Sequence, residues 1–286
     1  MRNMLKKLGV RLAMLVTVAL LGGFLAATLL RFAPGFGVDE RELDPRLSEA
    51  SREALRSSRQ LDSGLFIYYG HYLGRAVHGD LGTSQWLDRP VATLVKERLP
   101  VTVRSVAAGM AFCWFAAFVL ALSCMLHRGF LFELSSTLAS GLLIALPTGV
   151  VAMLAVYLRA PVYLAIAAVI FPKVFRYTRN LLDHAYTQPC VTAARARGVP
   201  NTSIVFRHVL PLVGAPILAL AGVSLSMAFG AAIPIEALCD SPGVGQLAWQ
   251  AAMNRDLPLI INLTLVLTSI TVAFNSLTGT RQEYGR

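Results

Sequence analysis

Few residues in this chain have the types and spacing that catalysis or metal binding needs. None of its lysines follows a glycine, so the sequence lacks the phosphate-binding loop of nucleotide-hydrolysing proteins. No two of its cysteines are separated by two residues, and no histidine pair encloses a glutamate in the zinc-protease pattern. The spacing of His71 and His78 is more typical of one solvated helix face than of a metal site. The sequence therefore predicts no catalytic residue and no metal site.

The residues best suited to recognition form a polar, basic island, Val191 to Pro211, between two long apolar segments. Ala193 and Ala194 favour helix and present a flat surface with little side-chain entropy to lose. Gly198 can adopt the left-handed backbone conformation that ends a helix and turns the chain. These residues predict a short helix followed by a turn.

A second short helix is expected after the turn. Pro200 prevents the first helix from continuing. The run Asn201-Thr202-Ser203 offers N-caps for a helix that reaches Leu210-Pro211. The pattern predicts a compact knob that a soluble partner can grip at the cytoplasmic face of a membrane, surrounded by the arginines Arg195, Arg197 and Arg207. The alternative is a solvated loop that only supplies positive charge.

The elements that must position this island are membrane helices. With 55% hydrophobic and 15% charged residues, the chain is too apolar for an ordinary soluble protein. Five uncharged runs each approach the roughly 20 residues needed to cross a bilayer, and they are Leu12–Leu30, Ser105–Leu126, Leu134–Leu158, His208–Ile235 and Leu257–Thr280. A sixth run, Ala160–Pro172, is long enough to span only if its helix continues through Lys173, Arg176 and Arg179, whose side chains can snorkel. We therefore expect an all-α membrane protein with six transmembrane helices.

The charges predict the orientation of these helices. With the N-terminus inside and six alternating spans, the inner segments hold 13 basic and 3 acidic residues, and 13 − 3 = +10 is the entire net charge of the chain. This distribution agrees with the positive-inside rule, so both termini are expected in the cytoplasm. The first run is longer than that of a usual signal peptide, and we expect an uncleaved anchor. The basic balance reflects topology and requires no nucleic acid as partner.

One membrane domain, residues 1–286, is expected to contain an external loop at 32–100, a cytoplasmic loop at 183–211 and a second external loop at 236–258. The first external loop carries a Gly-Asp-Leu-Gly turn. The second carries a Pro-Gly-Val-Gly run followed by an amphipathic helix. Aromatic residues in these loops are expected to contact a partner or to lie in the aromatic belt at the lipid headgroups; they are Tyr68, Tyr69, Tyr72, Trp86 and Trp249.

Three groups of motifs occur in a characteristic order along the chain. The island contains Ala193, Ala194, Gly198 and Leu210-Pro211. The first external loop contains Gly79-Asp80-Leu81-Gly82-Thr83-Ser84, Pro90-Val91 and Leu99-Pro100-Val101-Thr102. The second contains Glu236, Pro242-Gly243-Val244-Gly245 and Arg255-Asp256. In these motifs the chain resembles the transmembrane permease subunits of bacterial ABC importers, within the dipeptide/oligopeptide/nickel branch, and the island resembles their EAA motif.

The resemblance implies two docking sites. A cytoplasmic coupling helix is expected to bind the ATPase through Thr192, Ala193, Ala194, Arg195, Arg197, Gly198, Leu210 and Pro211. An external surface is expected to receive a binding protein through Gly79, Asp80, Gly82, Glu236, Gly243, Gly245 and Asp256.

The resemblance also implies partners and a location. These partners are a second permease subunit in a homo- or heterodimer, cytoplasmic ABC ATPase subunits, an extracytoplasmic substrate-binding protein and the lipid bilayer of the bacterial inner membrane. No cofactor of the chain's own is expected, because ATP is bound by the partner ATPase. The implied cargo is a short peptide, with nickel or another small solute second.

Some positions depart from the family pattern. Thr192 stands where the motif usually has glutamate, and Gly279 stands where an aspartate is common. The external loop around Arg159-Ala160-Pro161 is also short. These departures keep open a structural membrane subunit that has the permease fold but belongs to another assembly. An ion-coupled carrier is a further alternative, although no acidic residue lies centrally in an apolar run.

Overall fold

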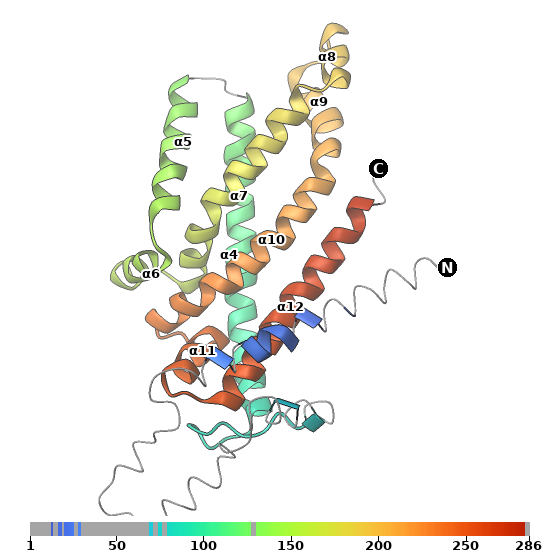
Figure 1. The fold of residues 1–286 in the computed structure, drawn as a ribbon. Coiled ribbons are helices and arrows are strands. Elements are labelled where there is room, and N and C mark those ends of the chain that lie inside the picture. The colour runs from blue at the N-terminus through green and yellow to red at the C-terminus, as the bar shows by residue number, and fades with distance from the viewer. Residues whose placement is uncertain are drawn as a thin grey trace, which may run out of the picture. The chain divides into compact units, whose positions relative to one another are not determined.

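The computed structural model describes residues 79–126 and 130–283, together with short pieces at 13, 17–18, 20–25, 28–29, 69–70 and 74–75. Almost all of these residues are helical, and β-structure among them is limited to one isolated bridge between Thr83 and Pro90 (Figure 1). A mostly helical fold is thus confirmed for this part of the chain. In chain order its main elements are α4 Val91–Leu126, α5 Phe130–Ala145, α6 Thr148–Tyr157, α7 Val162–Tyr186, α8 Pro189–Ala196, α9 Asn201–Ile204, the π-helix η2 Val205–Val209, α10 Leu210–Leu238, α11 Val244–Met253 and α12 Leu257–Glu283.

Three helices among the described residues are long and apolar enough to cross a membrane. They are Val91–Met125, Asn201–Leu238 and Leu257–Asn275. Each contains most of one apolar run predicted to span. The predicted first span, Leu12–Leu30, is described only in short pieces, so the structure does not test it as a continuous helix. The total of six transmembrane helices therefore stays a prediction.

The predicted third span, Leu134–Leu158, is not one straight helix. Its two parts, Leu134–Ala145 in α5 and Thr148–Tyr157 in α6, are bent by 99°. Pro147 accounts for the break, because it has no N–H to continue the hydrogen bonding of α5. With φ −61° and ψ 144° it instead forms the extended N-cap of α6. The pair is a fourth candidate span only if the break is counted within it.

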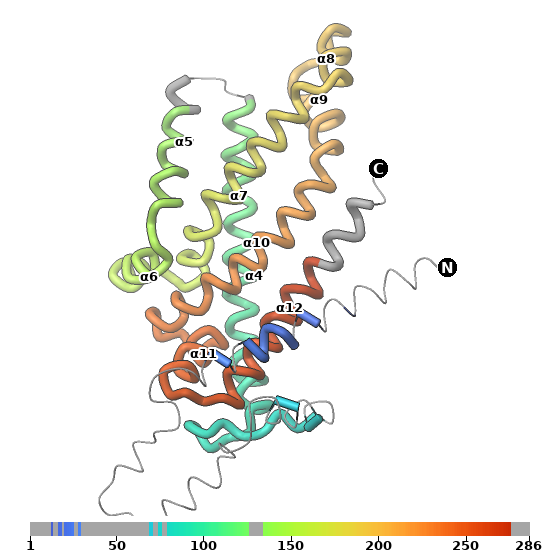
Figure 2. Tube along the Cα trace, viewed as in Figure 1, coloured from blue at the N-terminus to red at the C-terminus, as the bar shows by residue number. Residues whose placement is uncertain are grey.

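The chain divides into two compact units, Met1–Glu97 with Gln250–Ser269 and Arg98–Trp249 with Ile270–Arg286. In the second unit, α7 packs along α10 and against α5, while α6 packs against both α7 and α10 (Figure 2). The prediction that residues 1–286 act as one permease domain stays a prediction.

Within the second unit, α4 contacts both α7 and α10. A Cβ added to Gly109 would lie 2.8 Å from the backbone oxygen of Tyr163, so only glycine allows α4 to approach α7 this closely. The indole N–H of Trp114 donates to the hydroxyl of Ser224 on α10 at 3.1 Å. Close backbone contact and an interhelical hydrogen bond are both typical of helix packing inside membranes.

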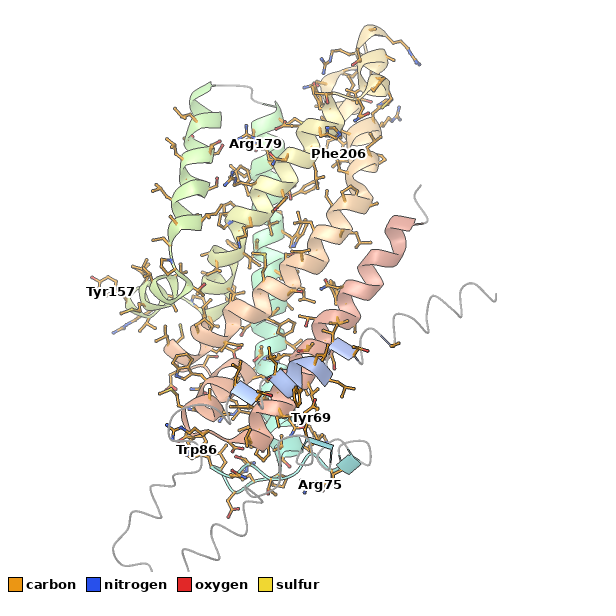
Figure 3. All side chains as sticks on the ribbon, viewed as in Figure 1. Tyr69, Arg75, Trp86, Tyr157, Arg179 and Phe206 are labelled. Carbon is orange, nitrogen blue, oxygen red and sulfur yellow. The ribbon has the colours of Figure 1, made fainter. Side chains whose placement is uncertain are left out.

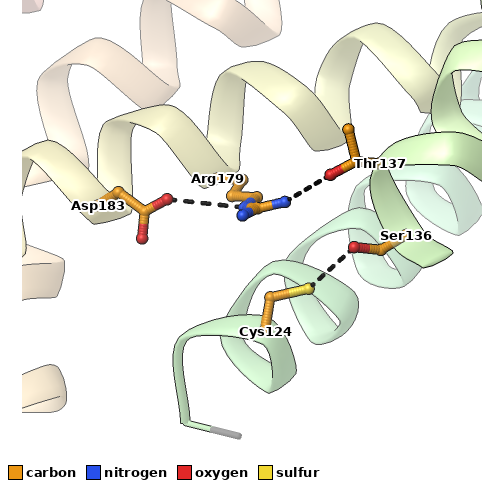
Figure 4. Close-up of polar contacts among 5 residues, drawn as sticks. All are labelled: Cys124, Ser136, Thr137, Arg179 and Asp183. Carbon is orange, nitrogen blue, oxygen red and sulfur yellow. Dashed lines mark hydrogen bonds and ion pairs between the residues drawn. The ribbon is translucent and has the colours of Figure 1, made fainter. Parts of the chain in front are cut away.

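The sixth apolar run forms α7, which continues as one helix through its three basic residues, as expected. Arg179 is partly buried: its guanidinium donates to the hydroxyl of Thr137 on α5 at 3.1 Å and lies 3.6 Å from the carboxylate of Asp183 (Figure 4). In the same region, Cys124 on α4 contacts Ser136 on α5 at 3.6 Å. Arg179 therefore joins α7 to α5 rather than extending alone toward an interface.

In the first unit, Tyr69 is a packing residue (labelled in Figure 3). It is only 7% exposed, its hydroxyl donates to the backbone oxygen of Leu20 at 2.7 Å, and its ring meets Phe24 edge-on. The expectation that Tyr69 contacts a partner is therefore wrong, because its ring and hydroxyl are both used inside the chain. Trp86 and Trp249 are exposed as expected, whereas Tyr68 and Tyr72 lie outside the described residues.

Candidate functional site

The predicted knob in the second unit is built on α8. Pro189 begins the helix, where backbone N–H groups have no partner within the helix and a proline costs nothing. At the other end Gly198 has φ +75°, and its N–H donates to the oxygen of Arg195 at 3.0 Å. The N–H of Val199 donates to the oxygen of Ala194 at 3.2 Å. This pair of bonds around a left-handed glycine closes the helix, so the predicted role of Gly198 is confirmed.

The helix α8 has a buried face and an exposed face. Val191 and Ala194 are buried, at 0% and 4% exposure. Ala194 therefore packs inside the chain and is not available for direct docking. The residues of α8 and its C-cap that are exposed are Thr192, Ala193, Arg195, Ala196 and Arg197.

Tyr186, at the C-terminal end of α7, holds the knob together. Its hydroxyl donates to the side-chain oxygen of Asn201 in α9. The guanidinium carbon of Arg195 lies 4.7 Å from the centre of the Tyr186 ring, within the range of a cation–π contact. One aromatic side chain therefore links α7, α8 and α9. Nothing in the sequence distinguished Tyr186 from other aromatic residues that follow an apolar run.

The predicted N-cap of the second helix is wrong. Pro200 occupies that position with φ −63° and ψ 146°, and no side chain caps the helix. Because proline already fixes the extended conformation that an N-cap needs, Asn201 becomes the first helical residue. The side chain of Asn201 then accepts the hydrogen bond from Tyr186.

The chain passes from α9 to α10 without a break. The predicted end at Leu210-Pro211 is replaced by a π-turn, in which the N–H of Leu210 donates to the oxygen of Val205. Pro211 lacks an N–H, and the helix accommodates it within the first turn of α10, next to this widened turn. Pro211 is exposed and Leu210 is partly buried. Phe206 on η2 is 63% exposed (Figure 3), which the sequence motif had not singled out.

A second cluster in the same unit surrounds Glu236 near the end of α10. Its Oε2 accepts a hydrogen bond from the hydroxyl of Thr102 on α4 at 3.0 Å and from the N–H of Gly245 on α11 at 2.7 Å. The Thr102 hydroxyl also accepts the N–H of Val244 at 2.7 Å. Glu236 is fully buried, and its Oε1 has no hydrogen-bond partner. The carboxylate thus caps the N-terminus of α11 and fixes it to α4 and α10.

The two glycines of the Pro-Gly-Val-Gly run make room for this carboxylate. An added Cβ at Gly243 would overlap Glu236, and one at Gly245 would lie 2.8 Å from both Glu236 Oε2 and the backbone oxygen of Ala232. Gly243 and Gly245 are buried. These residues and Glu236 were expected to dock a partner, but the structure buries them where the chain turns from α10 into α11.

The remaining predicted external residues lie in the first unit. Gly79 and Gly82 have φ +84° and +74°, and the N–H of Gly82 donates to the carboxylate of Asp80 at 2.9 Å. This geometry confirms the predicted turn. Gly79 and Asp80 are exposed, and Gly82 is partly buried.

Asp256 is buried in the first unit and organises the residues around it. Its Oδ1 accepts the N–H of Leu259 at 3.1 Å, so it caps the N-terminus of α12. Its Oδ2 accepts the hydroxyl of Ser84 and, at 3.1 Å, the N–H of Trp86. The amide of Asn262 donates to the oxygen of Leu81 at 2.8 Å. The predicted turn is therefore held to the start of α12 by polar side chains, of which Ser84 and Asn262 were not predicted as site residues.

The amino-acid sequence of this region matches a known family. Residues 114–284, more than half of the chain, match the family described as binding-protein-dependent transport system inner membrane component. The chain belongs to this family. The matched region contains the knob around α8, Glu236 with the start of α11, and all of α12, whereas Thr102 lies before it.

Curated relatives extend the similarity to nearly the whole chain. A putative peptide permease protein of Brucella suis biovar 1 is 28% identical and aligns with 97% of this chain and 95% of its own. The oligopeptide transport system permease protein AppB of Bacillus subtilis is 25% identical, with 88% of each chain aligned. A probable peptide ABC transporter permease protein of Sinorhizobium fredii is 24% identical, with 93% of each aligned. The resemblance predicted from the sequence motifs is therefore confirmed.

Family membership and the apolar helices together identify a multi-pass membrane protein and a component of a transport system. The family's own description names dependence on a binding protein, so such a system contains further subunits in general. The two departures from the family pattern lie on different helices. Thr192 is on the exposed face of α8, whereas Gly279 lies within α12.

Proposed function

We propose that the chain is a transmembrane pore subunit of an ATP-driven importer, in which a separate ATPase drives alternating access. The observation that carries this proposal is the exposed face of α8. That face stands on a knob fixed by the buried Val191 and Ala194, by the Gly198 closure and by Tyr186. A rigid knob can pass a movement of its partner to α7 and α10, which it joins.

The coupling role divides the predicted docking residues into two groups. Thr192 and Ala193 are small and exposed, so they form the surface that enters a cleft on the ATPase. Arg195 and Arg197 lie beside them. Ala194, Gly198, Leu210 and Pro211 position this surface and connect it to the membrane helix. ATP is bound by the ATPase, so the chain itself is non-catalytic and needs no cofactor.

The membrane arrangement follows from the charges. Six helices with both termini in the cytoplasm place the entire net charge of +10 on the inner face of a bacterial cytoplasmic membrane. A second permease subunit, identical or homologous, completes the pore. The external loops receive a substrate-binding protein, because they are too small to capture a ligand alone. The exposed Gly79, Asp80 and Trp86 contact it, whereas the buried Glu236, Gly243, Gly245 and Asp256 hold the loops in shape.

A short peptide is the proposed cargo, since relatives with nearly complete alignment are named as peptide permeases. Nickel or another small solute is second. A structural membrane subunit recruited into another complex is the alternative function. The presence of Thr192 at the glutamate position of an otherwise intact motif favours this alternative.

Co-purification from native membranes distinguishes the two functions. With the wild-type chain as bait, we expect an ABC ATPase that hydrolyses ATP. Ala193→Glu should lower its recovery at least tenfold, because a charge on the docking surface is buried without a partner. Asn180→Glu is the matched control, since it adds the same charge at an exposed position on α7. Equal recovery in both variants would reject the docking surface, and recovery of another membrane complex without an ATPase would support the structural alternative.

A further inference from the structure

The helix α6 presents an uncovered apolar face that the transport function does not explain. Val150, Met153, Leu154 and Tyr157 are exposed, with Tyr157 the most exposed at 84%. Figure 3 shows Tyr157 pointing away from the neighbouring helices of its unit. The opposite face packs against α7 and α10 and consists of Val151, Ala152 and Ala155. One side of α6 therefore belongs to the core, and the other side is not covered by any described part of the chain.

The length and ends of α6 argue against a membrane crossing. Its 10 residues extend about 15 Å, half of a hydrocarbon core of about 30 Å. Pro147 separates it from α5 at the 99° bend. At its other end Arg159 has φ +51°, and the N–H of Ala160 donates to the oxygen of Ala155 at 2.8 Å. The chain therefore turns at both ends of α6, and the bend at Pro147 directs α6 away from the axis of α5.

The position of α6 places it at the level where a spanning helix ends. Cys239 follows α10 directly, and its sulfur lies 3.9 Å from the backbone oxygen of Ala152. Within this unit, α6 lies at the end of α5 that is away from α8 and α9 (Figure 1). With α8 in the cytoplasm, this end is the external one.

The chemistry of the exposed face favours lipid as its partner. The helix carries no charged residue, and its exposed face is apolar apart from the Tyr157 hydroxyl. The preceding helix α5 also carries exposed leucines at the spacing of one helix face, which are Leu134, Leu138 and Leu142. In a membrane, a spanning helix places such a row of leucines against the acyl chains of the lipids. Tyr157 and the following Arg159 are residue types that favour the headgroup region.

We propose that α6 lies flat in the external membrane interface, with its exposed face in contact with the boundary between acyl chains and headgroups. A free interfacial helix needs a polar face opposite its apolar one. In α6 the opposite face packs against α7 and α10 instead. The third apolar run of the chain therefore does not form one straight span, because α6 leaves the direction of α5 and lies in the interface.

Depth measurements on spin-labelled protein test this proposal. Single cysteines replace Val150 and Tyr157 in a cysteine-free form of the full chain, reconstituted in vesicles of phosphatidylethanolamine and phosphatidylglycerol. The two positions are seven residues apart and share one face, so a crossing helix would separate them in depth by about 10 Å. A flat helix should leave them within about 3 Å of each other, judged from accessibility to oxygen and to a water-soluble nickel chelate.

The spanning helix α10 supplies the matched control. Leu212 and Val223 are both exposed and are eleven residues apart on one face, so labels there should differ in depth by about 16 Å. Equal, shallow depth on α6 together with this difference on α10 supports the proposal. A depth difference near 10 Å on α6 would overturn it. High access to the nickel chelate alone, or low access to both reagents, would also overturn it, because the face would then contact water or another protein.

Discussion

The hydroxyl of Thr102 on α4 donates to the carboxylate of Glu236 on α10 at 3.0 Å, and both side chains are buried. The same carboxylate oxygen accepts the N–H of Gly245 at the start of α11. Parts of α4, α10 and α11 within the second unit are therefore joined at one atom, which makes Glu236 a positioning residue for the turn between α10 and α11.

Removal of the Glu236 carboxylate should destabilise the protein more than its replacement by an amide. Glu236→Ala leaves the Gly245 N–H and the Thr102 hydroxyl without their acceptor, at a cost of about 1–3 kcal/mol for each. Glu236→Gln keeps an oxygen that can accept both bonds, so it should retain most of the stability. Thermal unfolding in detergent provides the comparison, and equal losses in the two variants would show that the hydrogen bonds are not the source.

The glycines around Glu236 should tolerate no side chain. Gly245→Ala introduces a Cβ 2.8 Å from backbone and carboxylate atoms, and overpacking of this kind costs about 1–3 kcal/mol. Gly230→Ala on α10 is the control, because an added Cβ there meets nothing within 4 Å. We expect a lower unfolding temperature only for Gly245→Ala. A similar decrease in both variants would instead indicate a general effect of changing a glycine.

The closure of α8 should depend on backbone conformation alone. Space around Gly198 is free, but its φ of +75° disfavours a β-branched side chain. Gly198→Val should therefore weaken association with the ATPase, whereas Gly198→Asn should keep it, since asparagine accepts the left-handed conformation. Quantified co-purification of the ATPase is the measurement. Full association of the valine variant would contradict the assigned role of the turn.

The link through Tyr186 should control access to the knob. Tyr186→Phe removes the hydrogen bond to Asn201 but keeps a ring under Arg195, whereas Tyr186→Leu removes both contacts. Limited trypsin digestion after the exposed Arg195 and Arg197 should therefore be fastest in the leucine variant and intermediate in the phenylalanine variant. Identical cleavage rates in all three proteins would exclude this stabilising role.

The location of the knob is testable with the native thiols. Cys190 on α8 is exposed, and we expect an impermeant maleimide to label it only from the cytoplasmic side. Burial raises the pKa of the Cys239 thiol, so less of it is thiolate at neutral pH and it reacts slowly there. A cysteine at Ser57 should react from the opposite side. Labelling of both positions from the same side would contradict the proposed topology.

The sequence predicted the helical class, the Gly198 turn and the Gly-Asp-Leu-Gly turn, because each depends on local propensity or backbone freedom. It did not predict the break of the third span. The sequence contains Pro147, but the apolar run continues on both sides of it, so the pattern does not indicate that the second helix bends away from the first. Glu236 and Asp256 each form a hydrogen bond with a residue more than 100 positions away in the sequence, and Asn262 does so with Leu81. No local pattern in the sequence contains these pairs.

Uptake of a labelled short peptide by vesicles containing the complex purified through this chain tests the central claim most directly. The importer account predicts accumulation that requires ATP and the binding protein, and that falls at least tenfold in Ala193→Glu but not in Asn180→Glu. A purified complex that contains no ABC ATPase and shows no ATP-dependent uptake of any peptide would contradict it.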